Sequence, residues 1–230
     1  MFEVILWDVD GTLLDFLAAE KAAIRATFAE MKLGECTDEQ IARYSVINKK
    51  YWKRMEDGEI TKAEVLSGRF LEFFAGEGIV ADVDEFNVLY QTALGDTVVY
   101  FDDADKLLSE LRGRVKQYAV TNGTRRAQRR KLANSGLDQI FDGIFISDEV
   151  GHEKPTSEFF DHVFREIGDI PRERVLIVGD SLSSDIRGGK NAGIPTCWYN
   201  PSGAPAPADN APDFVIGNLG EVKGILNNMT

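Results

Sequence analysis

Two carboxylates follow an apolar stretch near the start of the chain. The segment from Val4 to Leu14 is VILWDVDGTLL, so a run of strand-forming residues ends in Asp8 and Asp10 before Gly11. Because side chains alternate along a strand, Asp8 and Asp10 are expected to point to the same side. Neighbouring carboxylates repel each other unless one is protonated or a cation lies between them. The pair therefore indicates metal binding or acid–base chemistry, and a strand that ends in an Asx turn is the alternative interpretation.

Other side chains of types that can bind metal or phosphate also follow apolar stretches. They are Thr121, Asn122 and Gly123, then Lys154, and finally Asp180, with Asp185 five positions further on. If the apolar stretches are parallel strands, these residues meet at one edge of a sheet. Mg²⁺ binds through a few carboxylates together with water and phosphate oxygens. Backbone N–H groups at the Gly123 turn and the ammonium group of Lys154 suit the same phosphate, so the set predicts Mg²⁺-dependent phosphoryl transfer.

The second part of the chain alternates between amphipathic and apolar segments. We expect helices at 104–111, 125–135, 157–167 and 185–192, and strands at 117–120, 144–146, 174–178, 196–199 and 213–216. Such alternation is typical of a parallel sheet with helices on both faces. The predicted fold class is α/β with a Rossmann-like sheet.

A long helical stretch separates the first strand from the alternating part. Amphipathic segments follow one another from residue 15 to residue 99, and Thr37, Thr61 and Asp82 are predicted N-caps. A crossover between parallel strands needs only roughly a dozen residues, so this stretch is expected to be an inserted, all-helical cap. The predicted division is a catalytic core of residues 1–14 and 100–230 and a cap of residues 15–99, which would cover the carboxyl ends of the strands.

Composition and charge limit the partners of the chain. Its 230 residues are 43% hydrophobic and its net charge is −12. Such an acidic surface would repel a nucleic-acid polymer or an anionic membrane, so a small anionic substrate would need local cations. Cys36 and Cys197 have no metal-ligand spacing and are expected to be free thiols. Met1 leads directly into the first strand and no apolar run could span a membrane, which predicts a cytoplasmic protein. We expect it to be a monomer or a homodimer.

Four stretches resemble the four motifs of haloacid dehalogenase (HAD) superfamily phosphohydrolases. They are DVDGTLLD, VTNGT, HEKP and GDSLSSD, in this order and each beside an apolar strand. With a helical insertion directly after the first motif, the chain is similar to the subgroup with a type 1 helical cap. The resemblance covers the whole chain.

The resemblance implies a role for each acidic residue of the motifs. Asp8 would attack phosphorus and become an aspartyl phosphate. Asp10 would protonate the leaving oxygen and then deprotonate the water that hydrolyses the intermediate. Mg²⁺ would be held by Asp8, the backbone carbonyl of Asp10 and Asp180, with Asp185 as a further ligand or behind the ligands.

The other motif residues would hold the phosphoryl group. By the same resemblance, Thr121, Asn122 and Gly123 would bind its oxygens and Lys154 would neutralise them. A carboxylate nucleophile needs this screening before it can approach an anionic target.

The resemblance also includes enzymes with other chemistry. Haloacid dehalogenation displaces a halide, which needs no proton, and dehalogenases resembling this family lack an acidic residue at the place of Asp10, which favours phosphate chemistry here. Phosphonate-cleaving relatives use a cap lysine, but Lys49, Lys50, Lys53 and Lys62 are expected to be solvated. The basic run from Arg125 to Lys131 is likewise expected to be a solvated, salt-bridged helix face.

Substrate specificity would come from the cap in this architecture. Asn48, Tyr51 and Trp52 share one helical stripe, and Arg69 lies on another helix. They either fill the cap interior or form an aromatic wall with an amide and a guanidinium that bind a base. The stretches NKKYW, DGEIT, GRF and GDSLSSDIRGGKNAGIPTCWYN are similar to the pyrimidine 5′-nucleotidase branch, which implies a nucleoside monophosphate substrate.

The sequence thus favours a Mg²⁺-dependent phosphomonoesterase that acts on pyrimidine nucleoside 5′-monophosphates. Three alternatives remain open: a sugar phosphomutase, a broad-specificity small-metabolite phosphatase and a non-catalytic phosphate-binding regulatory module. Product analysis separates the first from a phosphatase, because a mutase gives an isomeric sugar phosphate and a phosphatase gives free phosphate.

Overall fold

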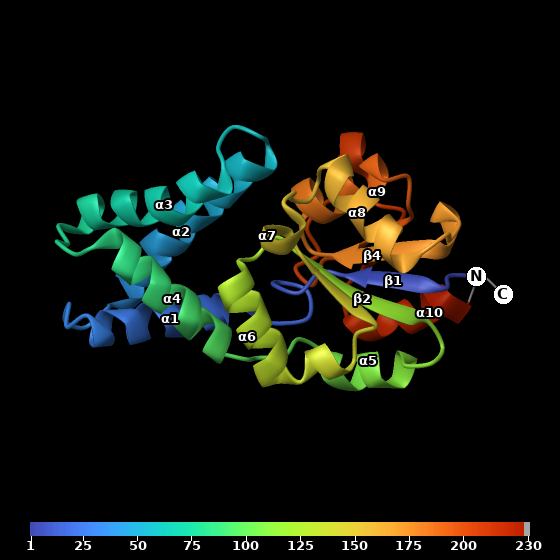
Figure 1. Cartoon of the computed structure of the whole chain (residues 1–230), viewed down its shortest axis with the longest axis horizontal. Helices are drawn as coiled ribbons and strands as arrows, with labels where there is room; N and C mark the ends of the chain where they lie inside the picture. Colours follow the sequence, from blue (N-terminus) through green and yellow to red (C-terminus); the bar gives the residue numbers. More distant parts are fainter. Residues whose placement is uncertain (228–230) are drawn as a thin grey trace.

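The computed structural model describes residues 1–227, so the last three residues of the predicted core range lie outside the described part. Within it, six parallel strands form one sheet in the order β3-β2-β1-β4-β5-β6 (Figure 1). This is the Rossmann-like α/β sheet that the sequence predicts. The strands are β1 (Val4–Trp7), β2 (Lys116–Thr121), β3 (Gly143–Ile146), β4 (Val175–Gly179), β5 (Thr196–Tyr199) and β6 (Phe214–Ile216).

Helices cover both faces of this sheet, as expected. Ile5 and Trp7 of β1 belong to one hydrophobic cluster and Val4 and Leu6 to another, because successive strand side chains point to opposite faces. Figure 1 shows α5 and α10 on one side of the sheet and α8 and α9 on the other. The helices of this part are α5 (Ala104–Leu111), α6 (Arg125–Ser135), α7 (Ser147–Val150), α8 (Ser157–Ile167), α9 (Arg187–Asn191) and α10 (Val222–Asn227).

Four longer helices form a bundle beside the sheet (Figure 1). Predicted N-caps are confirmed: the hydroxyls of Thr37 and Thr61 and the carboxylate of Asp82 each accept a backbone N–H from the first turn. The bundle has its own hydrophobic cluster, which also includes Ala127 of α6. The helices are α1 (Phe16–Glu30), α2 (Asp38–Glu56), α3 (Lys62–Glu77) and α4 (Val83–Asp96).

One predicted helix differs from the structure. The segment expected to be helical at 185–192 starts as a π-helical turn, Leu182–Ile186, and only Arg187–Asn191 is α-helical. The carboxylate of Asp185 accepts the backbone N–H of Ser181 at 3.1 Å and the ammonium group of Lys154 at 2.6 Å. These two bonds hold the wide turn in place, and π-turns of this kind are frequent at functional sites.

A bilayer-spanning helix is not found: within residues 1–227, none combines the required length and apolar character.

Candidate active site

The strand order reverses beside β1, between β2 and β4. The chain continues from β1 to β2 and β3 on one side, whereas β4, β5 and β6 extend the sheet on the other. In open α/β sheets, ligands bind outside the carboxyl ends of strands at such a reversal of order. Asp8 directly follows β1, and its backbone N–H donates to Val178 of β4 at 2.9 Å. Asp180 directly follows β4, so the topology brings both carboxylates to the carboxyl ends of these two neighbouring strands.

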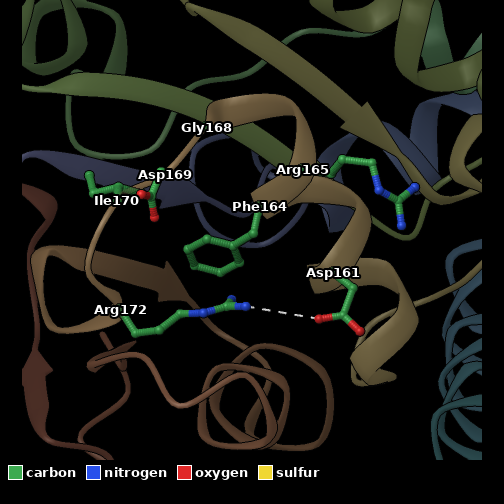
Figure 2. A pocket seen from close by; sticks show the side chains of 7 residues that line it. All are labelled: Asp161, Phe164, Arg165, Gly168, Asp169, Ile170 and Arg172. Carbon is green, nitrogen blue, oxygen red and sulfur yellow. Dashed lines mark ion pairs between the residues drawn. The ribbon is translucent and has the colours of Figure 1, made fainter.

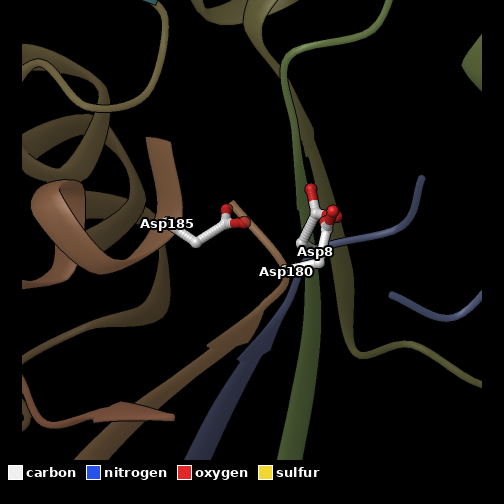
Figure 3. Close-up of side chains that lie close together, drawn as sticks. All are labelled: Asp8, Asp180 and Asp185. Atoms are coloured by element: carbon white, nitrogen blue, oxygen red, sulfur yellow. The ribbon is translucent and has the colours of Figure 1, made fainter. Parts of the chain in front are cut away.

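Three carboxylates converge there. Asp8, Asp180 and Asp185 each offer an oxygen, and these oxygens lie within 4.8 Å of one another (Figure 3). Asp8 and Asp185 are buried, whereas Asp180 is exposed. An oxygen-only site of this spacing, open on one side, fits a hard divalent cation that keeps water or phosphate ligands. The predicted convergence of these three residues is therefore present.

Glycines make room for the three carboxylates. A Cβ atom on Gly179, the last residue of β4, would lie 2.2 Å from Cγ of Asp185. A Cβ atom on Gly11 would lie 2.7 Å from Oδ2 of Asp180, and the backbone of Gly11 has a φ of +92°, which disfavours any other residue. Side chains at either position would displace a carboxylate.

Lys154 is the buried cation of the site. Its ammonium group donates to Oδ1 of Asp8 at 2.7 Å, to Oδ1 of Asp185 at 2.6 Å and to the carbonyl oxygen of Val120 at 2.7 Å. Burial alone would lower the pKa of Lys154, but the two carboxylates raise it above its ordinary value. Lys154 is therefore a fixed positive charge between two acidic groups.

Desolvation raises the pKa of each carboxylate in the cluster, and repulsion by other carboxylates of the cluster adds to the shift for Asp8 and Asp180. Burial is the largest cause for Asp8, whose pKa is raised to about 7 although Lys154 opposes the shift. Desolvation also raises the pKa of Asp185, again against Lys154, and that of Asp180, to which the charges of Asp8 and Asp185 add. A divalent cation would remove much of this repulsion, which supports the metal interpretation.

Thr12 joins the site although it is not among the predicted site residues. Its hydroxyl lies 3.0 Å from Oδ2 of Asp8 and 3.2 Å from Oδ1 of Asp180, and it accepts the backbone N–H of Asp180 at 3.0 Å. It is fully buried. The only signal was its position directly after Gly11, where the chain turns back along the cluster.

Asp10 lies outside the three-carboxylate cluster. Its Oδ1 pairs with Lys131 and its Oδ2 accepts the side-chain amide of Gln128. Both donors belong to α6. The expectation that Lys131 is solvated is therefore wrong, since it is fully buried. The rest of that run does form a salt-bridged face, in which Arg125 and Arg129 pair with Glu149 and Arg130 pairs with Asp96.

The segment after β2 lies beside Lys154. The side chain of Asn122 donates to the carbonyl oxygen of Lys154 and accepts its backbone N–H, both at 2.8 Å. The hydroxyl of Thr121 accepts the backbone N–H of Gly123 at 3.2 Å. Thr124 then caps the N-terminus of α6, so this turn leads directly into a helix N-terminus, a place where phosphate commonly binds.

The predicted specificity residues of the bundle have different surroundings. Asn48 and Arg69 are buried and joined by a 2.8 Å hydrogen bond, and Asn48 also donates to Glu20 at 2.6 Å. The guanidinium of Arg69 further donates to Asn87 at 3.2 Å and lies over the ring of Phe70. This is the arrangement expected of residues that fill the bundle interior. Trp52 is half-buried.

A second hollow lies at the end of α8 and shares no residue with the cluster. It is lined by the seven residues labelled in Figure 2, among them Phe164 and Arg172. The guanidinium of Arg172 stacks 3.3 Å from the centre of the Phe164 ring and pairs with Asp161 at 3.9 Å. The hollow is thus partly filled by its own arginine and offers no comparable group of ligands.

Comparison with known proteins agrees with this geometry. The profile of the haloacid dehalogenase-like hydrolases matches residues 2–193. The HAD-hydrolase YfnB of Bacillus subtilis is 38% identical over 98% of this chain and 96% of its own length. A crystal structure of that protein bound to magnesium, described as revealing interdomain movement, covers 98% of this chain and 99% of its own with a TM-score of 0.91.

Two further relatives carry the name pyrimidine 5′-nucleotidase. PynA of Streptococcus pneumoniae is 36% identical over 87% of this chain and 84% of its own length. YjjG of Escherichia coli is 32% identical over 96% of each.

Proposed function

The chain belongs to the haloacid dehalogenase-like hydrolases and is an enzyme of the phosphatase type, and we propose that it hydrolyses nucleoside 5′-monophosphates through an aspartyl phosphate on Asp8. One observation carries the proposal: the Asp8 carboxylate lies at the carboxyl end of β1, beside a buried ammonium group and close to two further carboxylates. The names of PynA and YjjG support the nucleotide as substrate.

Asp8 and Asp10 divide the chemistry in this proposal. One oxygen of Asp8 attacks phosphorus, the bond from phosphorus to the leaving oxygen breaks, and Asp10 gives that oxygen its proton. A water molecule then attacks phosphorus and gives a proton to Asp10, and the bond to Asp8 breaks with release of phosphate. Lys154 keeps a positive charge beside Asp8 during both steps, which stabilises the charge that the phosphoryl oxygens carry.

The proposed cofactor is Mg²⁺. The carboxylates of Asp8, Asp180 and Asp185 and the backbone carbonyl of Asp10 would hold it, and the three clustered carboxylates fit a cation of this kind. When bound, Mg²⁺ supplies positive charge that neutralises phosphoryl oxygens. Thr121, Asn122 and Gly123 would bind the same oxygens, because the turn that they form lies directly before the N-terminus of α6.

We assign residues 15–99 the role of a cap over residues 1–14 and 100–227. The supporting contacts are polar and join α2 and α3 to the sheet-bearing part. Glu56 accepts the hydroxyl of Ser183, Arg187 donates to Asp57 at 3.2 Å, and Lys62 pairs with Asp148 at 2.7 Å. A cap held by such bonds can exclude water from the carboxylate cluster while the side chains of the cap contact the leaving group of the substrate.

The test is phosphate release from a panel of nucleoside monophosphates and sugar phosphates, with Mg²⁺ and with a chelator. Asp8→Asn removes the nucleophile, and Asp209→Asn is the matched control because Asp209 is an exposed carboxylate of a surface turn. We expect turnover of UMP, dUMP or dTMP that disappears with the chelator and in Asp8→Asn but not in Asp209→Asn. Even, weak release across the panel would contradict the nucleotide assignment, and undiminished release by Asp8→Asn would contradict the mechanism.

A further inference from the structure

Lys131 is a fully buried lysine whose ammonium group pairs with the carboxylate of Asp10. The side chain of Lys131 is 1% exposed and that of Asp10 is 19% exposed. Burying an ammonium group is costly unless it is paired and hydrogen-bonded, and an apolar side chain of similar size often serves packing equally well. Its position on the inward face of α6 therefore calls for a role beyond packing.

Gln128 binds the other oxygen of the same carboxylate. It precedes Lys131 by about one helical turn, so the two side chains leave α6 on one face. Gln128 is itself fully buried. Its amide donates to Oδ2 of Asp10 while Lys131 donates to Oδ1, so both oxygens of the carboxylate have a donor from the same helix.

The surroundings of these two donors are shaped to bring them to Asp10. A Cβ atom on Gly123 would lie 2.2 Å from Nε2 of Gln128, so the Gln128 side chain crosses the turn through space that only glycine leaves free. The ammonium group of Lys131 lies 5.8 Å from the centre of the Phe16 ring, at the start of α1. The chain thus encloses both donors between the phosphate-binding turn and the first bundle helix.

We propose that Lys131 and Gln128 are positioning residues, which fix the Asp10 carboxylate where it exchanges a proton with the leaving oxygen and then with water. The inference rests on the proposed function, because it assigns these residues to the acid–base group of that reaction. A carboxylate with a donor on each oxygen has little rotational freedom, and fixed orientation is a large part of what general acid–base catalysis requires.

The leaving group provides a test that packing alone would not influence. An alkyl phosphate has a leaving oxygen that must be protonated, whereas p-nitrophenolate leaves without a proton. Water attack on the aspartyl phosphate needs Asp10 as base with either ester. Losing the orientation of Asp10 should therefore slow formation of the aspartyl phosphate with the alkyl ester only. It should slow hydrolysis of the aspartyl phosphate with both esters.

The variants are Lys131→Met and Gln128→Ala, with Arg129→Met as matched control, because Arg129 is a half-exposed basic residue of the same helix paired with Glu149. We expect Lys131→Met and Gln128→Ala to lower turnover of the alkyl ester roughly tenfold to a hundredfold. With p-nitrophenyl phosphate, the rate of the first turnover should stay within about twofold of the wild-type rate. A slower steady state should follow, so that p-nitrophenolate appears in a burst. Lys131→Arg should recover part of the loss, and Arg129→Met should behave as the wild type.

Equal losses with both esters and no burst would assign Lys131 and Gln128 to packing and overturn the inference, as would wild-type kinetics in both variants. If Lys131→Met does not fold, Gln128→Ala decides the question alone. The alkyl ester is whichever one the wild type hydrolyses fastest, so a wrong substrate class leaves the test intact. The Asp10→Asn variant separates the two proposals. If it loses no more activity with the alkyl ester than with p-nitrophenyl phosphate, the proposed function is contradicted. If it does lose more with the alkyl ester but Lys131→Met and Gln128→Ala do not, only the inference is contradicted.

Discussion

The ammonium group of Lys154 lies 2.7 Å from Oδ1 of Asp8, in a position where both side chains are buried. The same ammonium group also binds Asp185 at 2.6 Å. Lys154 therefore holds two of the three clustered carboxylates, and its removal would leave both without their cation.

Replacing Lys154 by methionine should lower phosphate release more than any loss of folded protein accounts for. Methionine keeps the length of the side chain but removes the charge that faces Asp8, so we expect kcat to fall about 10²–10³-fold. Lys190→Met is the control, because Lys190 is an exposed lysine of α9. Circular dichroism and steady-state kinetics on both variants check the expectation, and a Lys154→Met enzyme as fast as Lys190→Met would contradict it.

Gly179→Ala should destabilise the protein and weaken cation binding. The added Cβ would lie 2.2 Å from Cγ of Asp185, so the carboxylate or the strand must move, at a cost of about 1–3 kcal/mol in the free energy of unfolding. Gly76→Ala is the control without a close contact. Gly76 lies in α3, and a Cβ atom there would have no other atom within 4 Å. It should stabilise by about 0.5–1 kcal/mol. Urea titrations measure both, and equal effects of the two substitutions would contradict the close approach.

Mg²⁺ should stabilise the protein more at alkaline than at acidic pH. The pKa of Asp8 is raised from 3.8 to about 7 in the folded state, so between these values the folded state binds more protons than the unfolded state. The free energy of unfolding contributed by Asp8 without metal therefore falls as pH rises through this window. The cation binds the ionised carboxylates, which reverses the loss.

The measurement is the increase in Tm on adding Mg²⁺ at about pH 5 and about pH 8. Comparing the two increments in Tm cancels the contribution of carboxylates outside the cluster, such as Glu77, whose pKa is lowered by its hydrogen bond from Arg43. We expect the larger increment at the higher pH and a much smaller one in Asp8→Asn. An increment that is equal at both values would argue against a metal held by these carboxylates.

Both thiols should be unreactive in the native protein. Burial raises the pKa of Cys36 to about 11 and that of Cys197 to about 12, and both side chains are buried. Because the thiolate is the reactive form, iodoacetamide near pH 8 should label neither residue until urea unfolds the chain. Mass spectrometry after labelling checks this, and rapid labelling of native protein would contradict the burial of that cysteine.

Much of the fold follows from local patterns in the sequence. The run VILW alternates between two hydrophobic clusters of the sheet, and β1 has the expected bounds, Val4–Trp7. The capping boxes that begin at Thr37 and Thr61 set the starts of α2 and α3. Asp8, Asp180 and Asp185 could be grouped in advance because parallel strands end at one edge, a consequence of topology alone.

The contacts of α6 could not be derived with the same rules. A basic run in an acidic protein favours a solvated face, yet Lys131 and Gln128 share the buried face with Ala127 and Leu132. Helical periodicity counted from Ala127 would have placed them inward. Which carboxylate they bind depends on how α6 lies beside the segment that follows β1, and this long-range contact has no local signal. The same holds for Thr12, which bridges two residues that are distant in the chain.

The most direct measurement looks for the phosphoryl group on Asp8. We would mix the Asp10→Asn variant with phosphorus-32-labelled aryl phosphate and Mg²⁺, quench with acid and map the label by peptide analysis. We expect about one hydroxylamine-labile label per enzyme on the peptide that carries Asp8, because loss of the Asp10 base slows hydrolysis of the intermediate. The double variant Asp8→Asn, Asp10→Asn should carry none. Release of the phenolate by Asp10→Asn without label on that peptide, or label that persists in the double variant, would contradict the central claim.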